Sequence, residues 1–203
     1  MVGVDVGGTF TDVVLLADRE VTTVKVPTTD DQSAGVMQGL TRACSVADID
    51  PSEIAAFSHA MTVSVNALLE SAGATTALVT TDGFQDVLEI GRQDRPELYD
   101  LDAEKPTPLV PQQRRFEIDE RATVEGIERP VDEREVDALA ADLADSDIES
   151  VAVCFLHAYA HPENEQRVAE ILRERLDVPV SASHEVLAEF REYERTSTTV
   201  VDA

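Results

Sequence analysis

The chain begins with three short apolar stretches that are interrupted by polar residues. They cover residues 2–6, 11–16 and 21–26, and their length and valine-rich composition are typical of strands. Because only a few residues separate each stretch from the next, we expect the three strands to form a meander. Residues 7–9, Gly-Gly-Thr, lie at the tip of the first hairpin, where glycines are favoured.

Helical and extended patterns alternate along the rest of the chain. This order of elements predicts an α/β fold, in which a sheet of mixed strand direction is connected by helical crossovers. Asp30 or Asp31 is expected to cap the first helix, and the proline-bearing segment 96–111 is expected to form an ordered loop. The expected helices lie at about 31–43, 62–71, 84–90, 132–144 and 162–176, and the expected strands at about 55–58, 76–81, 115–124, 150–156 and 178–183.

Charge is the most restrictive feature of the composition. The 203 residues include 41 Asp and Glu against 16 Lys and Arg, which gives a net charge of −25 at pH 7. A protein this acidic repels nucleic acid and anionic membrane surfaces, which argues against both as partners. The acids are spread along the chain, and Lys25 and Lys105 are its two lysines. We interpret this pattern as halophilic, with a merely acidic cytosolic protein as the alternative.

The cysteines and the apolar stretches indicate an ordinary reducing environment. Cys44 and Cys154 have no spacing typical of metal ligands, so we expect two buried thiols. The sequence contains neither a signal peptide nor an apolar run of transmembrane length. We therefore expect a cytoplasmic protein.

The first hairpin carries the residues with the clearest chemical potential. Glycines at its tip leave no Cβ to block a ligand, and backbone N–H groups there can point at phosphate oxygens. An ordinary Gly-Gly hairpin is the alternative, but an acid within an apolar strand is costly without a partner. The segment is not a P-loop or a Rossmann fingerprint, because neither Gly-Lys-Ser/Thr nor a helix follows. The candidate ligands for phosphate and Mg²⁺ are Asp5, Gly7, Gly8, Thr9, Thr11 and Asp12.

Four longer motifs extend the pattern, at residues 62–70, 78–93, 95–101 and 191–201. Together with residues 5–12, they make nearly the whole chain resemble the N-terminal portion of the hydantoinase A / 5-oxoprolinase family. The resemblance implies an actin-like (ribonuclease H-like) ATPase fold, present here as one lobe with an additional αβ region. Members of the family open cyclic amides with ATP hydrolysis, so it also implies ATP and Mg²⁺ as cofactors and a hydantoin or 5-oxoproline type of substrate.

The resemblance implies a role for each candidate residue. A lactam resists attack by water, and phosphorylation of its amide oxygen by ATP makes it a better electrophile. The phosphate-binding residues implied are Gly7, Gly8, Thr9 and Thr11, the catalytic carboxylates acting through Mg²⁺ are Asp5 and Asp12, with Asp5 as the metal ligand, and the substrate-facing residues are His59, Thr62, Asn66, Arg92 and Arg95. For the two arginines, pairing with nearby acids is the alternative.

The resemblance also implies a domain organisation. Residues 1–95 would form the actin-like subdomain with the phosphate loop, residues 96–185 an inserted or second αβ region, and residues 186–203 the start of a second lobe. The partner would be that lobe or a hydantoinase B-type subunit, and the chain alone would be an incomplete enzyme. Residues 60–61, Ala-Met, replace the family's Gly-Thr after His59, which favours another cyclic or carbonyl substrate. A sugar-kinase-like phosphotransferase lobe and a non-catalytic assembly subunit are the alternative functions.

The acidic composition predicts that salt stabilises the folded chain. Raising KCl from about 0.1 M to 1 M shortens the screening length from roughly 10 Å to 3 Å, which weakens repulsion among the carboxylates. We expect the melting temperature, followed by circular dichroism, to rise clearly over this range. The same measurement in increasing sorbitol, an uncharged solute, controls for stabilisation by solute exclusion. A melting temperature that stays constant or falls with KCl would contradict the halophilic interpretation.

Overall fold

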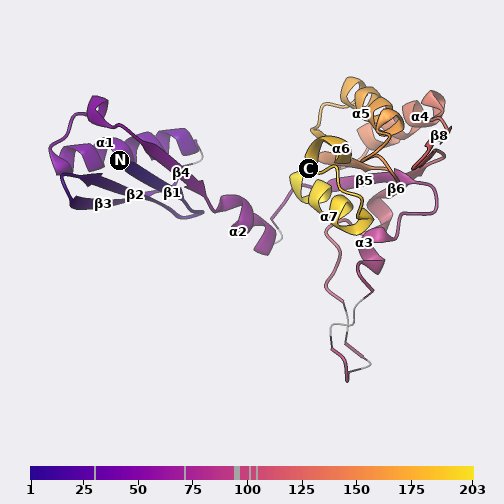
Figure 1. Ribbon diagram of the computed structural model, residues 1–203, viewed down its shortest axis with the longest axis horizontal. Helices are drawn as coiled ribbons and strands as arrows, with labels where there is room; N and C mark the ends of the chain where they lie inside the picture. The colour runs from indigo at the N-terminus through magenta and orange to yellow at the C-terminus, as the bar shows by residue number, and fades with distance from the viewer. Residues whose placement is uncertain (30, 71, 94–96, 101, 104) are drawn as a thin grey trace. The chain divides into compact units, whose positions relative to one another are not determined.

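The computed structural model describes residues 1–203 except 30, 71, 94–96, 101 and 104. The chain divides into two compact units, unit 1 at Met1–Gly73 and unit 2 at Ala74–Ala203 (Figure 1). The division falls earlier than the boundary expected at residue 95. The reason is that β5 (Thr76–Thr81) pairs with strands that come later in the chain, so it belongs to unit 2.

Unit 1 contains a four-stranded sheet in the order β3-β2-β1-β4. The expected meander is confirmed, since β1 and β2 pair antiparallel, as do β2 and β3, whereas β4 runs parallel to β1. The elements are β1 (Val2–Val6), β2 (Phe10–Ala17), β3 (Glu20–Pro27), α1 (Gln32–Ala47), the 3₁₀ turn η1 (Pro51–Glu53), β4 (Phe57–Met61) and α2 (Val63–Leu69). Parallel pairing places the carboxyl ends of β1 and β4 at the same edge of the sheet.

Helix α1 covers one face of this sheet. Asp31 caps its first turn by accepting hydrogen bonds from two backbone N–H groups, whereas Asp30 lies outside the described residues. Gly39 faces the sheet, where an added Cβ would lie 2.7 Å from a methyl group of Val13, so the close approach of helix and strand requires glycine. The alternating positions that fill the core between them are Val2, Val4, Val6, Val13, Leu15, Val24 and Val26, with Ala43 and Cys44 from α1.

Unit 2 is built on a four-stranded parallel sheet in the order β10-β9-β5-β6. Its strands beyond β5 are β6 (Arg115–Ile118), β9 (Ser150–Cys154) and β10 (Val180–Ala182), and a separate antiparallel hairpin pairs β7 (Arg121–Thr123) with β8 (Gly126–Arg129). Its helices are α3 (Val87–Ile90), η2 (Gln112–Arg114), α4 (Glu133–Ala144), α5 (Glu163–Arg175), α6 (Ser183–Val186) and α7 (Glu192–Asp202). Together the units confirm a mixed α/β architecture.

Both faces of the parallel sheet are covered, so every residue of β5 and β9 is buried. Alternate strand residues face opposite sides, as the pleat requires. Ala77 and Val79 belong to the core formed with α4 and α5, whereas Leu78 packs in a second core that includes Val200 of α7. The near-continuous apolar composition of these strands follows from this burial on two sides.

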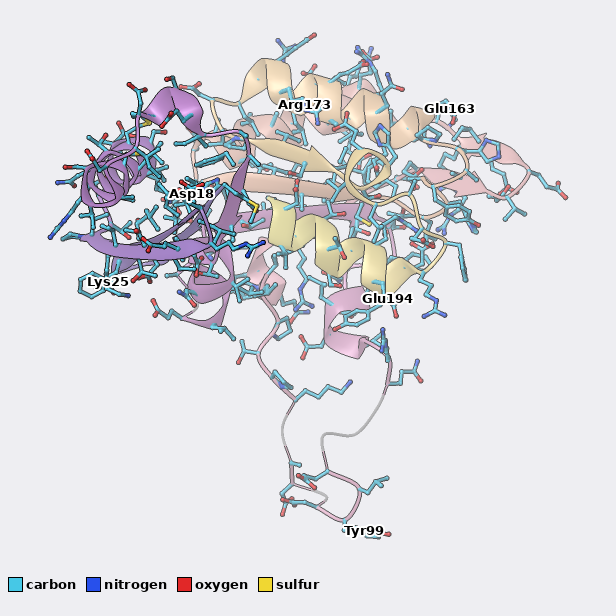
Figure 2. All side chains as sticks on the ribbon, turned by 60° about the vertical axis from the view of Figure 1, so that its left-hand side comes forward. Asp18, Lys25, Tyr99, Glu163, Arg173 and Glu194 are labelled. Atoms are coloured by element: carbon cyan, nitrogen blue, oxygen red, sulfur yellow. The ribbon has the colours of Figure 1, made fainter. Side chains whose placement is uncertain are left out.

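The proline-bearing segment between α3 and η2 runs as an excursion from unit 2 (Figure 2). Its described residues form neither helix nor strand before η2, as the sequence analysis expected. Tyr99 lies near the tip of this excursion with 99% of its surface exposed. In the described part of the chain, no helix is both long and apolar enough to cross a membrane.

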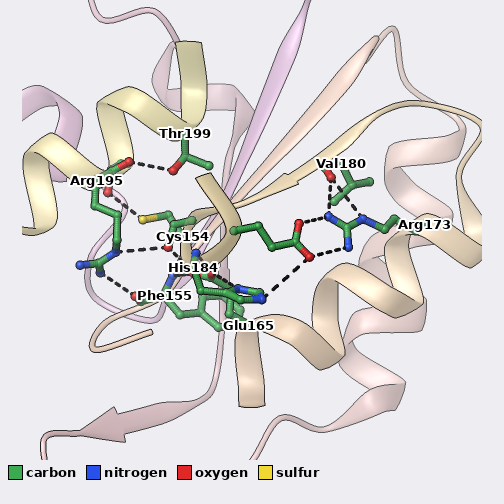
Figure 3. A network of polar contacts seen from close by, with 11 residues as sticks. Cys154, Phe155, Glu165, Arg173, Val180, His184, Arg195 and Thr199 are labelled. Carbon is green, nitrogen blue, oxygen red and sulfur yellow. Dashed lines mark hydrogen bonds and ion pairs between the residues drawn. The ribbon is translucent and has the colours of Figure 1, made fainter. Parts of the chain in front are cut away.

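A fully buried carboxylate, Glu165, joins three elements inside unit 2 (Figure 3). It accepts hydrogen bonds from the backbone N–H of Phe155 at 2.7 Å and from the hydroxyl of Ser183 at 2.8 Å. The backbone N–H and Nδ1 of His184 lie 2.8 and 2.7 Å from its other oxygen. This hydrogen bond with Glu165 raises the pKa of the His184 imidazole.

The guanidinium of Arg195 lies in the same interior with no exposed surface. It donates to the carbonyl oxygens of Phe155 at 2.8 Å and Glu189 at 2.6 Å, and it pairs with the carboxylate of Glu192. Beside it, burial raises the pKa of the Cys154 thiol to about 11, which makes it an unreactive thiol. Both cysteines are buried and free, as predicted.

The contact between His184 and Glu165 predicts a pH dependence of stability. The folded-state pKa of His184 lies above the unfolded value of about 6.5, so its stabilising contribution is complete below that pH and is lost as pH rises through the folded pKa. His184→Asn keeps a side-chain donor near Glu165 but removes the titration. We expect the difference in unfolding free energy between wild type and His184→Asn to shrink as pH rises from about 6 towards 9.

Urea unfolding at a series of pH values measures this difference directly. Comparison at equal pH cancels the contribution of Glu120, whose pKa is also raised, chiefly by burial. A difference that stays constant or grows with pH would show that the charged imidazole does not stabilise the fold.

Candidate phosphate site

The turn between β1 and β2 is held open at its tip. The backbone N–H of Gly7 donates to the carbonyl oxygen of Phe10 at 3.0 Å. Neither Gly7 nor Gly8 has a positive φ, so a left-handed conformation is not the reason for glycine here. The reason is space, because a Cβ on Gly7 would lie 3.0 Å from the Phe10 oxygen, whereas a Cβ on Gly8 would meet nothing within 4 Å.

Two backbone donors at this tip are available to a ligand. Within the described part of the chain, the N–H groups of Gly8 and Thr9 donate to no protein acceptor. Both residues are exposed, and the side chain of Thr9 adds a hydroxyl beside them. Successive free N–H groups in a turn form the kind of concavity that binds phosphate oxygens.

The two candidate carboxylates stand side by side next to the turn. Asp5 on β1 is directly opposite Asp12 on β2, and Asp12 is opposite Lys25 on β3. Lys25 projects from the sheet surface (Figure 2) and its ammonium lies 2.8 Å from an Asp12 oxygen. This ion pair offsets the repulsion that two facing carboxylates would otherwise have.

The carboxylates at this turn suit a hydrated Mg²⁺ better than a metal ion that is coordinated only by protein side chains. No cluster of three or more His, Cys, Asp or Glu suited to a metal occurs among the residues that the structure describes. Mg²⁺ is commonly held by one or two carboxylates, with water and substrate phosphate completing its shell. Asp5 and Asp12 therefore fit a hydrated Mg²⁺ that a bound phosphate helps to hold.

Thr11 occupies a different position from the one that the sequence suggested. Its side chain is only 1% exposed, and its hydroxyl lies 3.1 Å from the hydroxyl of Thr28. The β-pleat turns Thr11 towards the interior, because it follows Phe10 and precedes Asp12, which are accessible. Thr11 thus supports the turn from behind instead of facing a ligand directly.

One of the predicted substrate residues lies next to the turn. Thr62 precedes α2 at the carboxyl end of β4, and its hydroxyl is 3.3 Å from the carbonyl oxygen of Val6. His59 on β4 and Asn66 on α2 are exposed in the same unit, and the His59 ring centroid lies 6.3 Å from that of Phe57. The structure therefore groups Thr62 with the phosphate turn and leaves His59 and Asn66 on the adjoining strand and helix.

The predicted arginines do not join this group. Arg95 lies outside the described residues. Arg92 belongs to unit 2 and pairs with Glu194, with its Nε and Nη2 atoms 2.8 and 2.7 Å from one carboxylate oxygen. For Arg92 the structure thus matches the ion-pair alternative.

Arg92 borders a pocket of about 520 Å³ in unit 2. The pocket is mainly apolar, with Leu88, Ile90, Leu109 and Tyr193 among its lining residues. Its other cation, Lys105, donates to the carbonyl oxygens of Ile90 at 2.9 Å and Glu89 at 3.3 Å, which caps the end of α3. Both cations of the lining thus have partners within unit 2.

Sequence reasoning missed two residues that shape the phosphate turn, Lys25 and Thr28. Lys25 on β3 lies opposite Asp12 on the neighbouring strand β2, and Asp12 lies opposite Asp5 on β1. Finding this row of three charges requires the correct register of the meander. Thr28 follows β3 directly, so the same alignment would have placed it beside the first hairpin.

Comparison with known proteins gives a consistent result. The model of the hydantoinase/oxoprolinase N-terminal region matches residues 1–176. The chain is 43% identical to an uncharacterised protein of Methanocaldococcus jannaschii over 209 residues, which cover 100% of this chain and 30% of that protein. It is 37% identical to the caprolactamase subunit alpha of Pseudomonas jessenii, covering 99% of this chain and 30% of that subunit.

Solved structures agree with the sequence relatives. The nucleotide-free structure of acetone carboxylase, described in a study of ATP-dependent acetone carboxylation, matches with a TM-score of 0.87 and 26% identity over 99% of this chain and 31% of that chain. The ATP-dependent caprolactamase of P. jessenii matches with a TM-score of 0.81 and 34% identity over 100% of this chain and 31% of that chain. The chain therefore spans about three tenths of the length of these relatives.

The two glycines of the turn provide a matched pair of substitutions. Gly7→Ala would press a Cβ against the Phe10 carbonyl, whereas Gly8→Ala adds a methyl group in open space. We expect Gly7→Ala to lower the unfolding free energy by about 1 kcal/mol or more, and Gly8→Ala to change it by less than about 0.5 kcal/mol. Chemical denaturation measures both, and equal losses would contradict the packing of this turn.

Proposed function

Because the chain belongs to the hydantoinase/oxoprolinase N-terminal region family, we propose that it is the phosphate-binding part of an ATP-dependent enzyme that opens cyclic amides. The observation that carries the proposal is the pair of free N–H groups on Gly8 and Thr9, beside the carboxylates of Asp5 and Asp12. These groups provide donors for phosphate oxygens and ligands for Mg²⁺ in one short turn.

The charges of unit 1 support a role for Mg²⁺. Its sequence contains three Lys and Arg residues, namely Arg19, Lys25 and Arg42. Arg19 follows β2 at the end opposite the phosphate turn, Arg42 lies within α1, and Lys25 is paired with Asp12. Unit 1 therefore has little cationic charge of its own to offer phosphate. A bound Mg²⁺ would supply the positive charge that lowers repulsion between these carboxylates and ATP.

The proposed reaction begins at the carbonyl group of a cyclic amide. The amide oxygen attacks the γ-phosphorus of ATP, a bond to that phosphorus forms, and ADP leaves. Water then adds to the activated carbon, and the C–N bond of the ring breaks as the nitrogen takes up a proton, which leaves an acyl phosphate. A second water hydrolyses the acyl phosphate to a carboxylate and free phosphate. We assign Gly8 and Thr9 to the ATP phosphates and Asp5 to the metal, with Asp12 beside it. Thr62 is our candidate for contact near the transferred phosphate, and His59 and Asn66 are candidates for the substrate side.

A second substrate class has specific support. The acetone carboxylase structure has the higher of the two TM-scores and comes from a study of ATP-dependent acetone carboxylation, and acetone is a ketone. A ketone and a lactam share the carbonyl oxygen that ATP would activate, so the same phosphate turn suits both. Residues 60–61, Ala-Met, favour a substrate other than 5-oxoproline in either case. As part of the same proposal, this chain contacts either a second lobe of such an enzyme or a hydantoinase B-type subunit.

Asp5→Asn tests the proposed function, because it keeps the size of the side chain and removes the charge that orients Mg²⁺. The change should impair positioning of phosphate in the transition state more than binding of the substrate. In the ATP-dependent enzyme that contains this region, we expect kcat for ring opening to fall about 100-fold, roughly 2.7 kcal/mol, with the KM for the cyclic amide little changed.

Asp18→Asn is the matched control. Asp18 is an exposed acid in the turn after β2, and its left-handed backbone suits asparagine. It should retain wild-type activity. A folded Asp5→Asn enzyme with near-normal activity would show that the β1–β2 turn is an ordinary hairpin.

A further inference from the structure

We propose that Thr28 is a positioning residue that holds the phosphate turn open, an inference that rests on the proposed function of that turn. Thr28 lies just beyond the end of β3, outside the Gly-Gly-Thr segment itself. Its side chain and its backbone each bond one end of the tip. The hydroxyl donates to the carbonyl oxygen of Gly7 at 2.7 Å, and the backbone N–H donates to the carbonyl oxygen of Thr9 at 3.0 Å. Gly8 lies between these two fixed points.

The direction of the hydrogen bonds follows from the number of protons. A hydroxyl has one proton to donate, and that of Thr28 is used on the Gly7 carbonyl. The bond between the two threonine hydroxyls must therefore run from Thr11 to Thr28. The result is a relay from Thr11 through Thr28 to Gly7 that connects β2, the end of β3 and the end of β1. Because Thr11 is 1% exposed, water has little access to replace the relay.

The relay changes the shape of the turn. In an ordinary four-residue turn, the N–H of the fourth residue donates to the carbonyl oxygen of the first. Here these groups belong to Phe10 and Gly7, and within the described residues Phe10 makes no such bond. Residues 8–9 form a bend instead of a closed turn. The Gly7 carbonyl accepts the Thr28 hydroxyl in place of the Phe10 N–H, and we assign the open shape of the turn to this exchange of donors.

An open turn has a direct consequence for a phosphate ligand. The Gly7 carbonyl oxygen carries a partial negative charge, and it accepts a hydrogen bond from Thr28 within the protein. The N–H groups of Gly8 and Thr9 remain unpaired and accessible. Thr28 therefore acts through the shape of the turn and need not touch the ligand.

The experiment compares Thr28→Val, which keeps the shape of the side chain without the hydroxyl, with Thr28→Ser, which keeps the hydroxyl. Thr23→Val on the same strand is the control, because Thr23 is exposed and its side chain bonds no described residue. Amide exchange and ¹⁵N–¹H spectra are recorded first without nucleotide. In Thr28→Val we expect the amide signals of Gly8 and Thr9 to shift and the amide of Phe10 to exchange more slowly, because it gains the Gly7 carbonyl. Thr28→Ser and Thr23→Val should resemble wild type.

Mg-ATP is then titrated at millimolar concentrations into each variant. We expect the affinity of Thr28→Val to be about tenfold lower than that of wild type, and Thr28→Ser to restore it. If no variant binds Mg-ATP, the proposed function fails while the nucleotide-free spectra still judge the role of Thr28. Unchanged signals for residues 8–10 in Thr28→Val would overturn that role, whatever the nucleotide does.

A double variant separates positioning from stability. Thr28→Val alone leaves the buried Thr11 hydroxyl without its partner, which can destabilise the fold. Thr11→Val/Thr28→Val removes both hydroxyls, so it should recover much of that stability. If the relay positions the turn, the double variant still shows the closed-turn signals of Phe10. A double variant with wild-type signals would show that the bond to Gly7 does not determine the shape of the turn.

Discussion

The interior of unit 2 depends on two buried, opposite charges, Glu165 and Arg195. Neither has exposed surface, so neither can be hydrated, and each must be satisfied by the protein. Glu165 brings the start of α5 to the end of β9 and to α6 after β10, while Arg195 attaches α7 to the same strand end through the Phe155 carbonyl. Replacing Glu165 by an apolar residue would leave the buried N–H of Phe155 without its acceptor, which is more damaging than losing a surface ion pair. The carboxyl edge of the sheet is fixed by this network.

Buried polar groups need hydrogen-bond partners, and against this rule the free N–H groups of the turn in unit 1 are unusual. Polar groups inside both units have partners almost everywhere; among described side chains, the buried atom without one is Nδ1 of His157. At the phosphate turn the protein satisfies the Gly7 carbonyl and the Thr9 carbonyl, yet leaves the N–H groups of Gly8 and Thr9 to solvent. The carbonyl groups on either side of Gly8 are thus bonded, whereas the N–H groups of Gly8 and Thr9 are free. A site with that asymmetry favours an anionic ligand over a cationic one.

The sequence predicted the elements well because they follow from local periodicity, and it predicted their partners less well. The three-stranded meander and the helix at Glu163–Arg175 agree with the apolar pattern. The unit boundary differed because pairing of β5 with β9 joins segments more than 70 residues apart, which periodicity does not contain. For Thr11, the sequence shows a hydroxyl close to the glycines and so suggests a phosphate ligand. It does not show that Thr28 lies opposite this hydroxyl in the interior. The burial of Glu165 could not be expected either, since acids in a charged helix are normally exposed.

The acidity of the chain also constrains how it could recognise a polyanion. In unit 1 the ammonium of Lys25 already neutralises Asp12, so direct pairing of phosphate with Lys25 would compete with that contact. Backbone N–H groups carry no net charge and need no counter-ion, and they can face phosphate in a protein that is otherwise strongly negative. Asp5 has no such ammonium opposite it, because its neighbour across the sheet is Asp12. A divalent cation between Asp5 and phosphate would relieve both repulsions at once, which makes metal binding and nucleotide binding interdependent at this turn.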